Sequence, residues 1–275
     1  MKKEERNAAI TKWVLIGITI LFLGIMLLLP LVVVLVQAFR GGIAAYMSAV
    51  ADEYTIRALL LTLEATLCAV ILNTIFGLFA SFAVTKFDFK WKKILTTLID
   101  VPVTVSPIIA GLIFILLFGR RSILYDWLKA IHIKVVFAVP GIILATIFVT
   151  FPFISRELIP IMEAQGKDEE EAAALMGANG WTIFRRITFP HVKWALLYGI
   201  VLCTARAMGE FGAVSVLSGH LRGRTNTLPL HIEILFNEFQ YIPAFAVSSI
   251  LVVLAIFILV VRSVLESRGK KEYES

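Results

Sequence analysis

Charged residues are scarce in this 275-residue sequence: 17% of the residues are charged, whereas 59% are hydrophobic. Soluble globular domains contain about 25% charged and about 45–50% apolar residues. The composition therefore excludes an ordinary soluble domain and favours a membrane protein. Cysteine is rarer still, and its two copies, Cys68 and Cys203, lie inside apolar stretches. Neither a disulfide framework nor a cysteine metal site is indicated.

Motifs for catalysis and for nucleotide binding are also missing. The sequence contains no G-x-x-x-x-G-K-[ST] phosphate loop, no H-E-x-x-H and no G-x-S-x-G, and its four histidines do not form a ligand pair. We therefore predict a chain that is not an enzyme, binds no metal and holds no cofactor of its own. If it moves a solute uphill, the energy must come from a partner protein or from an ion gradient.

The net charge of +6 comes from short basic clusters beside apolar runs. Such clusters suit lipid headgroups and fix membrane orientation, so we expect a bilayer and not nucleic acid as partner. Six apolar stretches are long enough to cross it. The first is too long for a signal peptide and has no cleavage site, so we expect it to be retained. The predicted spans are residues 13–39, 59–85, 101–119, 135–155, 194–217 and 239–261.

The fold class is accordingly all-α, a polytopic membrane protein with six transmembrane helices. Pro102 and Pro107 predict a bent entry to the third span. Of the 26 Lys and Arg residues, 17 lie in the head, the 86–93 connection, the 156–193 connection and the tail, and eight lie on the opposite face. The excess predicts that both termini and the 156–193 connection are cytoplasmic. The expected parts are a head (1–12), a permease domain (13–262) with its long polar loop at about 156–193, and a tail (263–275).

The polar loop contains "EAAALMGANGWTIFRRITFP", residues 171–190. Asp168 and Glu171 have the spacing of a capping box with Asp168 as N-cap, and Gly177 stands where a helix would stop. The short helix would expose Ala172, Leu175 and Met176 on one face. A second helix, 181–187, is expected before Pro190 starts the return into the membrane. From these residues alone, an amphipathic loop on the headgroups remains the alternative.

The order Glu171-Ala172-Ala173, three residues, Gly177, nine residues, Ile187, one residue, Phe189-Pro190 resembles the "EAA" signature E-A-A-x3-G-x9-I-x-L-P. That signature belongs to the permease subunits of ABC importers; Phe189 replaces its Leu. The resemblance implies a MetI-like permease fold forming half of a translocation pore. It also implies that the loop is a coupling helix, docking on a separate ATPase that binds ATP and Mg. The coupling residues would be Glu171, Ala172, Ala173, Leu175, Met176, Gly177, Ile187 and Pro190.

The fifth predicted span carries Arg206 and Glu210, four residues apart on one helix face. A charge at the centre of a membrane helix costs about 2.5–3.5 kcal/mol, so the two should pair or face a cavity. They are either a structural pair or part of an anion pathway. Glu64 in the second span has no evident mate and either lines a pathway or pairs with another helix. The outer segment 228–239 has apolar residues at helical spacing, as in a helix resting on the membrane or a landing surface for a binding protein.

The stretches "LIDVPVTVSPIIAGL", "RAMGEFGAVSVLSG" and "LRGRTNTLPL" resemble the sulfate/thiosulfate importer permeases of the CysW type. This resemblance implies a homologous second permease (CysT type), an ABC ATPase dimer (CysA type) and a sulfate/thiosulfate-binding protein as partners. It also implies a multi-pass protein of the bacterial cell (inner) membrane. The alternatives are a permease for another oxyanion, molybdate or tungstate, and an ion-coupled carrier that works without an ATPase.

Overall fold

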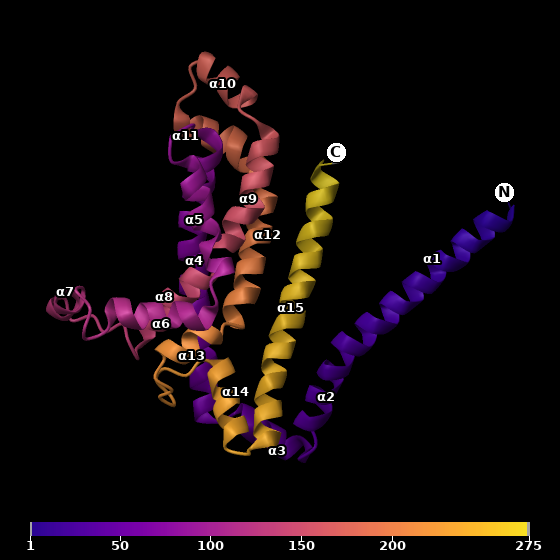
Figure 1. Cartoon of the computed structure of the whole chain (residues 1–275), viewed down its shortest axis with the longest axis vertical. Helices are drawn as coiled ribbons and strands as arrows, with labels where there is room; N and C mark the ends of the chain where they lie inside the picture. Colours follow the sequence, from indigo (N-terminus) through magenta and orange to yellow (C-terminus); the bar gives the residue numbers. More distant parts are fainter. Residues whose placement is uncertain (1, 274–275) are drawn as a thin grey trace. The chain divides into compact units, whose positions relative to one another are not determined.

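The computed structural model describes the backbone of residues 2–273 and the side chains of residues 10–269. Within that range the chain is helical and contains no strand, which confirms the all-α prediction. Figure 1 shows the helices in chain order. They are α1 (Lys2–Leu23), α2 (Leu29–Ala38), α3 (Gly42–Val50), α4 (Glu53–Lys86), α5 (Lys92–Thr104), α6 (Pro107–Phe118), α7 (Tyr125–Ala130), α8 (Val139–Thr150), α9 (Pro152–Gln165), α10 (Asp168–Leu175), α11 (Gly180–Ile183), α12 (Phe189–Met208), α13 (Gly212–Leu217), α14 (Leu228–Asn237) and α15 (Tyr241–Tyr273), with π-helical turns η1 (Gly24–Leu28) and η2 (Phe184–Thr188).

The chain divides into two compact units. The first comprises the chain up to Asp52 together with Ile232–Val252. Its small core contains Ala38, Ala49 and Ala246, and Tyr46 packs against it. The Tyr46 hydroxyl lies 3.1 Å from Ser249 Oγ, which gives its polar atom a partner. The apolar span Ile10–Ala38 has no buried side chain in its most apolar window, so it offers its surface to lipid or to another protein.

The second unit, Glu53–His231 and the chain from Val253 onward, contains a bundle of α4, α8, α9 and α12 (Figure 1). Small residues on the inner face of α4, among them Ala65, Ala69 and Gly77, allow close helix contacts. The buried Asn73 joins α4 to α8 by donating to Thr150 Oγ1 at 2.8 Å and to the Ile147 carbonyl at 3.2 Å. A side-chain amide shared between two helices is a common device for fixing their register where no water can compete.

Five helices are long and apolar enough to cross a membrane, and one bent pair of helices makes up to six. Five of the six expected spans are thus found, with shifted limits, and the bent pair covers the expected third span. The unbroken spans are Ile10–Ala38, Glu53–Lys86, Val139–Gln165, Gly180–Met208 and Tyr241–Gly269. The charged head and tail continue helices α1 and α15 within the described residues, because charge at a membrane surface does not stop a helix.

The third span is the bent pair: α5 and α6 meet at 109°. The bend falls at Val105 and Ser106, which are extended, and Pro107 begins α6. A residue before proline is driven out of the helical region, so the proline fixes where α5 ends. Pro102, by contrast, is accommodated inside α5. The expected bend is confirmed, with Pro107 at the break.

Two prolines inside long helices are preceded by a π-helical turn. η1 ends at Leu28, two residues before Pro30, and η2 ends at Thr188, two residues before Pro190. Proline cannot donate a backbone hydrogen bond and collides with the preceding turn, and one wider turn relieves both problems without ending the helix. The expected second helix, residues 181–187, is found, but it is not separate: the helix begins at Gly180 and continues past Pro190 to Met208.

Much of the polar region predicted at 156–193 is helical. α9 carries the chain as a helix to Gln165, and residues 166–179, which include α10, join it to the next long helix. Charged residues in 156–165 extend α9 instead of ending it. Arg156, for example, lies on α9 and pairs with Asp100 of α5 at 2.8 Å.

Candidate functional site

α10 lies in the short connection between α9 and α11, at one end of the bundle (Figure 1). Its last helical residue is Leu175, and Gly177 follows the C-cap with a φ of +87°, the left-handed conformation expected of a helix stop. The Gly177 amide donates to the Ala174 carbonyl, and the Ala178 amide donates to the Ala173 carbonyl, both at 3.0 Å. This pair of bonds is the Schellman arrangement. The sequence prediction for Gly177 is confirmed.

The start of α10 differs from the prediction. Asp168 is the first helical residue and Lys167 is the N-cap, whose side chain makes no capping hydrogen bond. The Asp168 N-cap was wrong by one position, because the chain turns at Gly166 (φ +72°) and enters the helix one residue earlier. Four acidic residues still occupy the first turn, where the helix dipole stabilises negative charge.

The expected apolar face is exposed. Leu175 and Met176 are 90% and 83% exposed, and Ala172 is exposed beside them. We call Leu175 and Met176 the apolar tip. Ala173, one position along from Ala172, is 6% exposed and packs inward. These two large apolar side chains are not packed within the chain, so they are available to a partner protein or to lipid headgroups.

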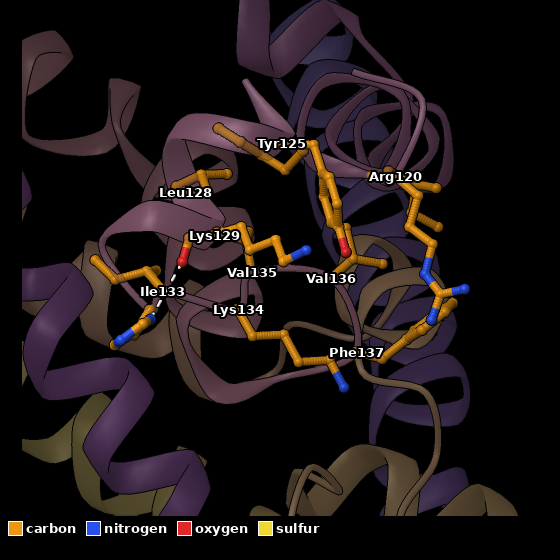
Figure 2. A pocket seen from close by; sticks show the side chains of 13 residues that line it. Arg120, Tyr125, Leu128, Lys129, Ile133, Lys134, Val135, Val136 and Phe137 are labelled. Atoms are coloured by element: carbon orange, nitrogen blue, oxygen red, sulfur yellow. Dashed lines mark hydrogen bonds between the residues drawn. The ribbon is translucent and has the colours of Figure 1, made fainter. Parts of the chain in front are cut away.

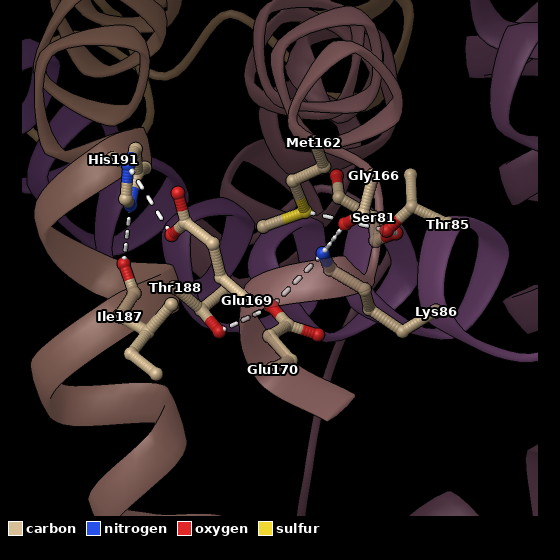
Figure 3. A network of polar contacts seen from close by, with 10 residues as sticks. All are labelled: Ser81, Thr85, Lys86, Met162, Gly166, Glu169, Glu170, Ile187, Thr188 and His191. Carbon is tan, nitrogen blue, oxygen red and sulfur yellow. Dashed lines mark hydrogen bonds and ion pairs between the residues drawn. The ribbon is translucent and has the colours of Figure 1, made fainter. Parts of the chain in front are cut away.

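A buried ion pair fixes α10 to the bundle (Figure 3). Lys86 Nζ, at the end of α4, lies 2.9 Å from Glu170 Oε1 and donates to the Gly166 carbonyl at 2.7 Å. Thr188 donates to the same Glu170 oxygen at 2.6 Å. The Lys86 and Glu170 side chains are only 5% and 14% exposed. Lys86 thus ties the end of α4 both to Gly166, before α10, and to Glu170, within α10. Through Thr188, Glu170 also ties α10 to the turn that leads into α12.

Weaker contacts surround this pair. Lys167 Nζ lies 3.3 Å from Asp88 Oδ2, and His191 Nε2 lies 3.7 Å from Glu169 Oε2. The hydrogen bond from Lys167, with the charges of Lys167 and Lys92, holds the pKa of Asp88 below its usual value. Asp88 is consequently ionised at physiological pH, and this exposed contact does not respond to pH changes in the neutral range. Exposed pairs of this kind contribute little to stability.

Sequence reasoning correctly placed Glu171, Ala172, Ala173 and Leu175 in one short helix, with Met176 at its end and Gly177 as the residue that stops it. Ile187 is half-buried in η2, and Pro190 is exposed at the start of α12. Sequence reasoning missed Lys86, Glu170 and Thr188. The Lys86–Glu170 contact joins segments about 80 residues apart, and the Thr188–Glu170 contact joins segments about 20 residues apart. Sequence reasoning also missed Trp181, which is 69% exposed beside α10. The available signal was a lone tryptophan in an otherwise polar connection.

Breaking the buried pair should loosen the loop. Lys86→Met is expected to destabilise the docked position of α10 by about 3–5 kcal/mol, because it leaves a buried carboxylate without its counter-charge. Chymotrypsin digestion of membranes should then cleave the loop faster. The double variant Lys86→Met/Glu170→Met should be cleaved more slowly than the single one, since no buried charge remains. Asp88→Asn, which breaks only the exposed contact, is the control. If Asp88→Asn is cleaved as fast as Lys86→Met, the Lys86–Glu170 pair is not what holds α10 in place.

The Arg206–Glu210 pair forms, though not on one helix face as expected. α12 ends at Met208, so Arg206 lies in its last turn and Glu210 in the break before α13. Arg206 Nη1 lies 2.6 Å from Glu210 Oε2. Glu210 Oε1 accepts a hydrogen bond from the Ala213 amide at 2.9 Å, at the start of α13. The break falls at Gly209, because glycine has a low helix propensity. Glu210 thus joins two helices.

The geometry favours a structural pair, since the Glu210 side chain is 1% and that of Arg206 31% exposed. We expect Arg206→Gln/Glu210→Gln to keep most of the uptake, because two amides retain a hydrogen bond and leave no unpaired charge. Glu210→Gln alone should reduce the amount of folded protein in the membrane, since Arg206 is then unpaired. A double variant that is folded but transports nothing would assign Arg206 to an anion pathway instead.

Two predictions remain, one for the segment 228–239 and one for Glu64. The outer segment 228–239 forms α14, but Leu228 and Leu230 are fully buried, and the Leu228 amide donates to Thr62 Oγ1 at 2.7 Å. α14 therefore begins inside the protein and does not simply rest on a membrane. Phe236 and Phe239 are exposed. Glu64 lies on the exposed side of α4.

An all-helical chain with up to six candidate spans, and one exposed, anchored helix between two of them, fits a polytopic membrane protein. Residues 73–271 match the model of the family described as "Binding-protein-dependent transport system inner membrane component". This is more than half of the chain, so the chain belongs to that family of ABC-transporter permeases and is a transport component, not an enzyme.

Curated relatives agree. The chain is 45% identical over 257 residues to the sulfate transport system permease protein CysW of Escherichia coli (strain K12), covering 94% of this chain and 88% of the relative. It is 45% identical over 258 residues to the protein of that name from Synechococcus elongatus, covering 94% and 90%. The sulfate transport system permease protein CysT of Escherichia coli is 32% identical over 253 residues, covering 92% and 91%.

A solved structure supports the fold. A chain in the crystal structure of a bacterial alginate ABC transporter, in complex with its alginate pentasaccharide-bound periplasmic protein, matches with a TM-score of 0.80. The match covers 98% of each chain at 18% sequence identity. At that identity the likeness concerns the fold, which confirms the predicted MetI-like ABC-transporter permease architecture and the multi-pass membrane character.

Proposed function

We propose that this permease subunit carries sulfate or thiosulfate across the bacterial inner membrane. Two observations support the substrate. The relatives at 45% identity that cover nearly the whole chain are sulfate permeases. The stretches of α12, α13 and the following connection that resemble sulfate permeases lie together in the second unit.

The chain would form half of a pore. Its likeness to both CysW and CysT proteins fits a pair of homologous permeases, in which a CysT-type chain supplies the other half. The large exposed apolar surface of α1 and α2 fits such a partner as well as lipid. A CysA-type ATPase dimer, which binds ATP and Mg, and a sulfate/thiosulfate-binding protein would complete the assembly.

The apolar tip is the observation that carries the coupling mechanism. Leu175 and Met176 would insert into a cleft of the ATPase, and closure of the ATPase dimer would move α10. Because the buried Lys86–Glu170 pair and Thr188 tie α10 to α4 and to the start of α12, that movement passes to two long helices at once. Rigid-body motion of these helices would switch the pore between its inward-open and outward-open states. The loop, the head and the tail would then be cytoplasmic, as the distribution of Lys and Arg predicts.

Uptake assays test this function. Cells that lack the chain should lose uptake of labelled sulfate, and the cloned chain should restore it. Excess unlabelled thiosulfate should compete, whereas stronger competition by molybdate or tungstate would assign the other oxyanion class. Vanadate should block uptake. Uptake that ignores vanadate and collapses with an uncoupler would indicate an ion-coupled carrier instead.

A further inference from the structure

The connection between α6 and α8 folds around a pocket that the coupling mechanism does not use. The pocket has a volume of about 640 Å³, and all of its lining residues lie between Ile115 and Phe137, in the second unit. Figure 2 shows it from close by. Its size is within the range of about 300–1,000 Å³ that is typical of sites for small molecules.

The polar lining of this pocket is cationic. Arg120, Lys129 and Lys134 line it, and none of its thirteen lining residues is acidic. None of the three takes part in an ion pair among the described side chains, residues 10–269. Tyr125 and His132 add a hydroxyl and an imidazole. Three unpaired cations around one space repel one another, and an anion placed between them removes that repulsion.

The rest of the pocket is apolar and firmly held. Leu128 and Val135 line it and are 7% and 4% exposed. The Phe137 amide donates to the Leu217 carbonyl at 2.9 Å, which ties the end of the connection to α13. At the turn after α7, the Ile133 amide donates to the Leu128 carbonyl at 3.0 Å. The three cations thus line the same pocket as a hydrophobic wall that is fixed to the bundle.

The outside of the same connection is strongly hydrophobic. Ile123 is 98% exposed and Trp127 63% exposed, with Leu124 and Ile131 exposed nearby. Exposed apolar groups of this size are unfavourable in water but stable in the interfacial layer of a bilayer, where tryptophan is enriched. An apolar rim beside a cationic pocket matches a molecule with an anionic head and a hydrocarbon body.

We propose that this pocket binds the phosphate headgroup of an anionic phospholipid, with the head held by Arg120, Lys129 and Lys134 and the first part of the acyl chains against the apolar wall. A free oxyanion would satisfy the cations and leave the apolar wall unused. The lipid would hold the α6–α8 connection at the membrane surface, whichever solute the pore carries.

Native mass spectrometry of the full chain in its native assembly tests the proposal. Three probes are titrated: dioleoylphosphatidylglycerol, dioleoylphosphatidylcholine and inorganic sulfate. Phosphatidylglycerol should bind more tightly than phosphatidylcholine. Lys134→Gln should weaken phosphatidylglycerol binding about fivefold, and Lys129→Gln/Lys134→Gln about thirtyfold, because each basic residue near an anionic surface contributes about 1 kcal/mol. These side chains are exposed, so the variants should unfold at the wild-type temperature.

Arg121→Gln is the matched control, because Arg121 lies on the same connection, is exposed and does not line the pocket. It should leave binding unchanged. An equal loss in Arg121→Gln would reduce the effect to diffuse attraction and overturn the site. Tighter binding of sulfate than of phosphatidylglycerol would make it a free-anion site. Unchanged lipid binding, with weaker attachment of the substrate-binding protein in the double variant, would make it a protein-docking surface.

Discussion

Gly177→Val is expected to reduce transport about tenfold or more while the protein still inserts into the membrane. Gly177 has a φ of +87°, and a side chain with a Cβ costs about 1–2 kcal/mol in the left-handed region, more when it is β-branched. The Schellman bonds to Ala173 and Ala174 would open, and the apolar tip would lose its position. Uptake should fall about tenfold or more, since such a strain shifts the population of the native loop by that factor. Labelled-sulfate uptake, normalised to the amount of protein in the membrane, measures it.

Gly180→Val is the control for this substitution. Neither Gly177 nor Gly180 has a heavy atom within 4 Å of the position where a Cβ would stand, so added bulk collides with nothing at either position. Only Gly177 has a positive φ. Gly180→Val should therefore transport at a rate near that of the wild type. Normal uptake by Gly177→Val, or equal losses in both variants, would show that the left-handed stop is not needed for coupling.

Leu175→Asp is expected to remove the ATPase from the complex. The side chain is 90% exposed in the chain, so the substitution costs the fold itself little. In a docked complex the new carboxylate would be buried in an apolar cleft without a partner, and a central apolar anchor of an interface contributes about 2 kcal/mol or more. Co-purification of the ATPase with the tagged chain should drop about thirtyfold or more, and uptake should fall with it.

Phe239→Asp is the matched control for the tip variant. Phe239 is a large apolar residue that is 78% exposed, and the charge distribution predicts that its connection faces away from the cytoplasm. The same replacement there should leave ATPase co-purification at the wild-type level. If Leu175→Asp retains the ATPase as well as Phe239→Asp does, α10 is not the docking element.

Local features of the fold could be predicted because they depend on residues close together in the chain. Apolar stretches long enough to cross a bilayer predicted the spans, Pro107 predicted the bend, and Gly177 predicted the helix stop. The errors occurred at the limits of elements. A helix that leaves the membrane continues through charged residues, as α9 does from Arg156 to Gln165, and a π-helical turn lets a helix pass Pro190.

Contacts between distant segments could not be predicted. Nothing in the sequence around Lys86 indicates that its ammonium meets Glu170, because that pairing depends on how α4 and α9 pack. The same holds for Glu210, which was expected to pair with Arg206 but whose second oxygen caps α13. The predicted site therefore had the correct apolar tip and helix stop but lacked the residues that anchor them.

Labelling of Met176→Cys with a membrane-impermeant maleimide tests the coupling mechanism most directly. Met176 is 83% exposed, and both native cysteines lie within spanning helices, Cys68 half-buried and Cys203 buried. The cysteine at position 176 should react in inside-out vesicles stripped of ATPase, be protected when the ATPase is added back, and stay unlabelled in intact cells. Labelling from outside intact cells, or no protection by the ATPase, would contradict the account.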